Sequence, residues 1–176
     1  MATTPASWKA AAAGEEELDY VLFDVQSSTT TANTVLNFFS RAESAQNKRT
    51  TNMPLASNLP STQRFLVREV QLVGDSEFST ATDQSDAFDG GSVELTINKR
   101  RYLHGDMRCF LGPGMRVPPG VTNVDESFSG TGFKLERGIV LPGGTEFNVE
   151  VITGDTAPTA AQQLTVRLIG TLVRAL

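Results

Sequence analysis

The sequence predicts an all-β domain of about eight strands. Three stretches alternate strictly between apolar and polar residues, namely 93–97, 146–151 and 164–168. This period of two is typical of strands with one buried and one solvated face, as in antiparallel sheets. Gly and Pro clusters separate the runs, and no stretch after residue 20 shows a sustained helical apolar period. Together these observations favour a sandwich, a barrel or a jelly roll.

The other strands are predicted from runs rich in β-branched and aromatic residues: 20–25, 35–39, 64–73 and, in shorter or broken form, 101–111 and 133–141. A short helix over 34–45 is an alternative to the second of these runs. In 64–73 the apolar positions are odd-numbered up to Val67 and even-numbered from Val70 onward. A one-residue change of phase across Arg68 and Glu69 predicts a β-bulge.

Two connections, residues 40–59 and 74–91, are longer than tight hairpins need. Long crossings of this kind are how Greek-key and jelly-roll topologies pass between sheets. Residues 1–18 are Ala-rich, with Gly14 interrupting the helix-favouring run, and we expect an arm outside a main domain at 19–176. Trp8 suggests that the arm docks on a neighbour, because Trp is favoured as an interface anchor. The alternative is a frayed terminus without a role.

Composition limits the function classes. The chain has 176 residues, which fits one domain with a substantial core. Its net charge is −5, from 15 Lys plus Arg and 20 Asp plus Glu, whereas general nucleic-acid binders carry a basic excess. We therefore expect no direct nucleic-acid contact. No signal peptide or membrane-spanning apolar stretch is recognisable, and the single Cys109 suits folding in a reducing cytosol. Cys109 lies in an apolar run and is expected to be buried.

Candidate catalytic groups are few. His104 is the only histidine, so a zinc site or a metal-binding cupin site cannot be built from several His ligands, and a Ser-His-Asp centre would have to use His104. A carboxylate pair for sugar hydrolysis can always be imagined among 20 acidic residues, but one Trp and two Tyr leave few stacking platforms for a sugar. We therefore predict no enzyme activity, no cofactor and no small-molecule substrate.

Two charged segments invite a binding role. Residues 75–91 are polar and acidic; clustered carboxylates suit calcium, but the spacing is not that of an EF-hand, and a solvated loop is favoured. Asn98 is followed by Lys99, Arg100 and Arg101, directly after an alternating strand. We predict that these three basic residues contact an acidic neighbour such as another subunit, the alternative being a solvated strand end.

Several segments together resemble a known family. They are 35–39, 51–60 (TNMPLASNLP), Gln63 with 65–67, 138–145 (GIVLPGGT), 147–151 and 166–174. In layout they are similar to the early and the last strands of jelly-roll capsid proteins from tailless icosahedral bacteriophages. The resemblance covers about residues 20–176.

This resemblance implies two four-stranded antiparallel sheets facing each other. The chain is long enough for one such roll, so the fold expected is a single eight-stranded jelly roll with an N-terminal arm. The implied function is a structural subunit of a virion, made in the host cytoplasm and assembled with copies of itself and other capsid proteins into an icosahedral shell. In several such viruses the shell encloses a lipid membrane, which would suit an acidic subunit that does not touch the genome.

Two other functions remain open. A jelly-roll binding module, such as a phage spike or a lectin-like receptor-binding domain, would share the fold. A lectin is expected to show exposed aromatic residues or a calcium site, and both signals are weak in this sequence. A jelly-roll enzyme is disfavoured by the single histidine.

Overall fold

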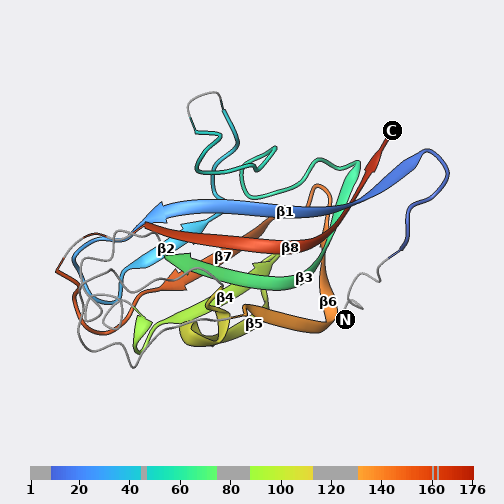
Figure 1. Cartoon of the computed structure of the whole chain (residues 1–176). Helices are drawn as coiled ribbons and strands as arrows, with labels where there is room; N and C mark the ends of the chain where they lie inside the picture. Colours follow the sequence, from blue (N-terminus) through green and yellow to red (C-terminus); the bar gives the residue numbers. More distant parts are fainter. Residues whose placement is uncertain (1–8, 45–46, 75–87, 113–130, 160, 162) are drawn as a thin grey trace.

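Two layers of β-sheet make up the protein in the computed structural model (Figure 1). The structure describes residues 9–44, 47–74, 88–112, 131–159, 161 and 163–176. Its eight strands form two four-stranded antiparallel sheets. The all-β prediction and the predicted number of strands are therefore confirmed.

The first sheet has the order β1-β8-β3-β6. Its strands are β1 (Glu15–Ser27), β8 (Gln163–Ala175), β3 (Gln63–Gly74) and β6 (Phe133–Pro142). The second sheet has the order β2-β7-β4-β5. Its strands are β2 (Val35–Phe38), β7 (Phe147–Ile152), β4 (Ser92–Ile97) and β5 (Arg100–Asp106). With this strand order in both layers, the fold is a single jelly roll.

The chain passes repeatedly between the two sheets. The connections from β2 to β3 and from β3 to β4 both cross from one sheet to the other, as the lengths of 40–59 and 74–91 predict. In contrast, β4 and β5 are neighbours in one sheet and form a hairpin. The outermost pair of the first sheet joins the two ends of the described chain, because Glu15 pairs with Ala175 and Ser27 with Gln163.

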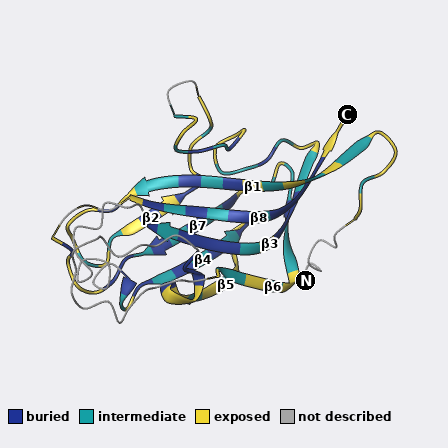
Figure 2. Cartoon of the chain, viewed as in Figure 1, coloured by how far each residue is buried: buried dark blue, intermediate teal, exposed yellow. Residues whose placement is uncertain are grey.

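Apolar side chains of both sheets fill the space between the layers. Six phenylalanines have essentially no exposed surface: Phe38, Phe39, Phe65, Phe88, Phe110 and Phe147. They pack with aliphatic side chains from both sheets to form one hydrophobic core. Figure 2 shows the central strands β8 and β3 as mostly buried and the edge strand β5 as largely exposed. The alternating positions 93, 95 and 97 all point into this core, as the sequence predicts.

The predicted bulge in β3 is confirmed. The pairing of β3 with β8 shifts between Val67 and Glu69, so Arg68 is the extra residue. Gly170 pairs with Val67 at this point, and a Cβ atom built on Gly170 would lie 1.8 Å from the Leu66 carbonyl oxygen. Only glycine allows the two strands to approach this closely.

Three features differ from the sequence expectations. Where a helix over 34–45 was the alternative, the described residues 34–44 contain the strand β2 and no helix. The strand expected over 101–111 ends at Asp106, where a short 3-10 helix, η1 (Met107–Phe110), begins with Asp106 capping the Arg108 amide. Strand β1 begins at Glu15, so residues 15–18 of the expected arm belong to the sheet.

The free edge of β1 is partly closed by the long β2–β3 connection. The Asn52 side chain accepts a hydrogen bond from the Phe23 amide at 2.8 Å and donates one to the Val21 carbonyl oxygen at 2.7 Å. The Thr50 carbonyl oxygen accepts from the Val25 amide at 2.7 Å. These contacts occupy edge groups of β1 from Val21 to Val25, as a ninth strand would do.

Candidate functional site

The outer faces of the two sheets differ in polarity. On the sheet β2-β7-β4-β5 the positions that alternate with core residues are mostly polar or charged: Asn37, Ser92, Glu94, Thr96, Asn148, Glu150, Arg101 and His104. Val35 and Ile152 are the apolar members of this face and pair with each other. A face of this kind is what an antiparallel sheet in contact with water shows.

The outer face of the sheet β1-β8-β3-β6 is mixed, with apolar side chains among charged and polar ones such as Asp19, Glu69, Lys134 and Arg167. Its apolar side chains are Val21, Phe23 and Val25 of β1, Ile169 and Val173 of β8, Leu66 and Val73 of β3, and Val140 of β6. Val21 is 39% exposed, whereas Leu66 and Val173 are buried without belonging to the core cluster. Exposed apolar patches on a protein surface commonly mark interaction sites. This face is the candidate interaction surface of the protein.

The predicted basic cluster occupies the β4–β5 hairpin. Asn98 and Lys99 form the two-residue turn, with φ of 48° and 62°, which fits a type I′ hairpin turn. Lys99 and Arg100 are exposed at this tip. Arg101 instead lies on the polar outer face, where its Nε is 2.6 Å from a Glu94 carboxylate oxygen. The structure thus places Arg101 on the face of the sheet, and Lys99 and Arg100 at the tip of the hairpin.

His104 lies beside the same carboxylate. Its Nδ1 is 3.6 Å from Glu94 Oε2, and its side chain is 50% exposed. The neighbouring strand places Glu150 directly opposite Glu94. His104 is therefore a surface residue of a charged row on the polar face. Among the residues that the structure describes, no group of three or more His, Cys, Asp or Glu side chains could hold a metal ion.

Arg64 holds part of the predicted arm against the sandwich. Its guanidinium forms two parallel hydrogen bonds to the Glu15 carboxylate, at 2.8 and 2.9 Å. It also donates to the carbonyl oxygens of Lys9, at 3.1 and 3.2 Å, and Ala10, at 3.0 Å. The Arg64 hydrogen bonds, with a further one from the Ala12 amide, lower the pKa of Glu15 to about 2. Residues 9–15 are thus fixed by their own chain, while Trp8 lies outside the described residues.

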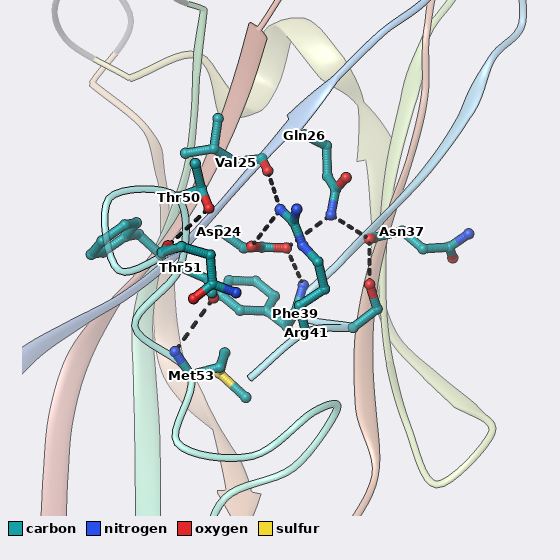
Figure 3. A network of polar contacts seen from close by, with 12 residues as sticks. Asp24, Val25, Gln26, Asn37, Phe39, Arg41, Thr50, Thr51 and Met53 are labelled. Atoms are coloured by element: carbon teal, nitrogen blue, oxygen red, sulfur yellow. Dashed lines mark hydrogen bonds and ion pairs between the residues drawn. The ribbon is translucent and has the colours of Figure 1, made fainter. Parts of the chain in front are cut away.

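A buried carboxylate organises the corner between β1 and β2 (Figure 3). Asp24 has no exposed surface; it accepts hydrogen bonds from the Phe39 amide at 2.7 Å and from Arg41 Nη2 at 3.3 Å. Arg41 also donates to the Val25 carbonyl oxygen at 2.6 Å. Phe39 has a φ of 66°, a left-handed conformation that is rare for a bulky residue. Asp24 therefore satisfies the amide of a strained residue, which indicates a structural role.

Cys109 is exposed, so the prediction that it is buried was wrong. It lies in η1, where Met107 and Phe110 take the buried positions and leave Arg108 and Cys109 at the surface. The acidic segment 75–91 lies outside the described residues except for its last four. Of these, Asp89 forms an ion pair with Arg108.

Sequence reasoning missed both Arg64 and the apolar side chains of the outer face. Arg64 has no local signal, because its partners are residues 49 and more positions earlier in the chain. The signal for the outer face lay in residues 20–25, which are apolar or aromatic at every position except Asp24. Alternation could not decide which face of such a strand is buried.

Comparisons with known protein-family models, curated proteins and solved structures found no match. In the part of the chain that the structure describes, no helix has the length and apolar character needed to cross a bilayer.

Proposed function

We propose that this protein is a structural subunit of a viral capsid, a single jelly roll that assembles with copies of itself and with other shell proteins. The observation that carries the proposal is the outer face of the sheet β1-β8-β3-β6. A stand-alone sandwich keeps its outer faces mostly polar. Here one outer face carries a row of apolar side chains on an edge strand, Val21, Phe23 and Val25. Burial of this row against neighbouring subunits would stabilise an assembly.

The fold supports this function without fixing it, since one fold serves many functions. A shell subunit needs a rigid sandwich and self-complementary surfaces, because closed symmetry multiplies modest contacts. The core provides the rigidity, and the Lys99–Arg100 tip provides a charged contact at one end of the sandwich. In this proposal the protein acts by assembly in the virion and not by chemistry.

Light scattering and negative-stain electron microscopy of the purified full chain test the proposal. We expect a large oligomer of defined size. Val25→Arg places a charge in this apolar row and should reduce this size strongly. Val35→Arg is the matched control, because Val35 is also on an outer face of an edge strand but belongs to the polar sheet; it should leave the oligomer intact.

A full chain that remains monomeric at all concentrations would contradict self-assembly and favour the binding-module function. Equal effects of the two Arg variants would show that assembly does not depend on the apolar residues of this face. Both variants must first show unfolding midpoints close to that of the unchanged protein, since otherwise misfolding and not loss of a contact would explain a smaller particle.

A further inference from the structure

The free edge of β1 is open over its first half. The β2–β3 connection occupies the backbone groups that residues 21, 23 and 25 turn to this edge. Alternation along a strand turns the backbone groups of Glu17 and Asp19 to the same side. No described residue bonds to these groups of Glu17 and Asp19. We call residues 17–19 the open edge.

The open edge is acidic. The side chains of Glu17 and Asp19 are exposed, and within the described part of the chain neither carboxylate forms an ion pair. The two preceding carboxylates are already paired, Glu15 with Arg64 and Glu16 with Arg174. Two copies of this edge would repel each other, because like charges would lie opposite. The open edge therefore suits a cationic partner.

The tip of the β4–β5 hairpin is such a cation. Lys99 and Arg100 are exposed there, and Lys99 forms no ion pair with a described residue. The Asn98 amide donates to the Glu146 carbonyl oxygen at 2.8 Å, which fixes the turn against the start of β7. A lysine ammonium has three donors, which the carboxylates and free carbonyl oxygens of the open edge can accept.

The tip and the open edge lie at opposite margins of the sandwich. Strand β1 lies beside β2, and the Gln26 side chain donates to the Asn37 carbonyl oxygen at 3.2 Å. Strand β5 is the far edge of the sheet that begins with β2. Figure 1 shows β1 at the top of the sandwich and β5 at the bottom. The two complementary surfaces of one chain therefore cannot meet each other, but they can meet on two copies.

We propose that the hairpin tip of one copy, Lys99 with Arg100, docks on the open edge of the next copy, at Glu17 and Asp19. The contact joins two different surfaces, so it repeats from copy to copy and builds a ring or a longer array. The inference rests on the proposed function, because its partner is a second copy of this chain.

Complementation between two charge-reversed chains tests the proposal. The tip variant is Lys99→Glu with Arg100→Glu, and the edge variant is Glu17→Lys with Asp19→Lys. Each alone should raise the concentration at which half of the protein is assembled by about tenfold, because like charges then meet at every contact. An equimolar mixture should assemble almost as the unchanged chain does, since each tip then finds an edge of opposite charge. Light scattering over a concentration series measures both.

The matched control is a mixture of the edge variant with Lys48→Glu, Arg49→Glu. This pair is exposed and changes the charge equally, but it is not at the tip, so the mixture should not restore assembly. Circular dichroism and urea midpoints must first show that all variants are folded. Should a double variant unfold, the single variants Lys99→Glu and Asp19→Lys take its place.

The outcomes separate this proposal from the proposed function. Restoration by the tip variant but not by the control supports the contact. Assembly that depends on Val25 but is not restored by the mixture, or is restored equally by the control, overturns the contact and leaves the function standing. Restoration together with indifference to Val25→Arg supports the contact without the apolar row. An unchanged chain that stays monomeric at all concentrations overturns both.

Discussion

Arg64 and Glu15 meet as a two-pronged ion pair across an intervening strand. Arg64 Nη1 and Nη2 lie 2.8 and 2.9 Å from the two carboxylate oxygens of Glu15, although β8 separates β3 from β1 in the sheet. The paired geometry is the strongest form of a charge-assisted hydrogen bond to a carboxylate. It ties the start of β1, and the arm residues before it, to the centre of the sheet.

This ion pair predicts acid sensitivity at the arm. The pKa of Glu15 falls from the ordinary 4.5 to about 2 in the folded protein. Because the folded-state pKa is the lower one, the pair stabilises the fold fully above about pH 4.5, and the contribution is lost as the pH falls towards 2. Titration of the Glu15 carboxyl by NMR should give a midpoint near 2. Arg64→Met should raise this midpoint towards 4.5 without reaching it, because the hydrogen bond from the Ala12 amide remains.

The matched control is Arg167→Met, which removes a cation from the same outer face but not from Glu15. It should leave the Glu15 midpoint unchanged. A midpoint near 4.5 in the unchanged protein would show that the ion pair does not persist in solution.

Replacement of Asp24 should destabilise the fold. Asp24→Ala leaves the buried Phe39 amide and part of Arg41 without a partner, and the free energy of unfolding should fall by about 2–4 kcal/mol. Asp24→Asn keeps an acceptor for the amide and should lose about half of that. Urea denaturation with an unchanged slope measures both. Glu150→Ala, on the polar face, should stay within about 0.5 kcal/mol; an equal loss there would refute a special role for Asp24.

Gly170 should tolerate no side chain. In Gly170→Ala the Cβ atom would collide with the Leu66 carbonyl oxygen, which is backbone and cannot swing away. We expect a loss of about 3 kcal/mol in unfolding free energy. Gly14→Ala measures the cost of a positive φ without a steric collision. Gly14 has a φ of +85°, and no atom lies within 4 Å of a Cβ built on it. This variant should lose only about 1–2 kcal/mol, and equal losses would argue against the close approach of β3 and β8.

Charge reversal at the hairpin tip tests the predicted contact of the basic cluster. Lys99→Glu combined with Arg100→Glu should weaken assembly, measured as oligomer size against concentration, with little change in stability because the tip is exposed. Lys48→Glu combined with Arg49→Glu changes the net charge equally at another exposed pair. If both double variants weaken assembly alike, net charge and not the tip is responsible.

Local sequence patterns predicted much of the fold. The alternation at 93–97 placed β4 with the correct face inward, and the change of phase around Arg68 located the bulge, because strand geometry imposes both patterns directly on the sequence. Residues 15–17 gave no strand signal, since three successive glutamates join β1 through distant partners such as Arg64 and Arg174. Asp24 was equally unpredictable, because burial of the charged residue depends on Arg41 and the Phe39 amide.

The pairing of β1 with β8 also governs the order of events during folding. The pair with the smallest sequence separation, Ser27 with Gln163, is 136 positions apart, and Glu15 pairs with Ala175 near the end of the chain. At ribosomal speeds of 5–20 residues per second, β1 leaves the ribosome at least about 7–27 s before its partner. Strand β3, on the other side of β8, also needs β8 as its hydrogen-bonding partner. The first sheet therefore closes only when the last strand arrives, and such non-local pairing makes for slow folding. Until β8 is made, the strand edges and apolar side chains of β1 and β3 that pair and pack with β8 stay uncovered. Aggregation is therefore most favoured during this interval.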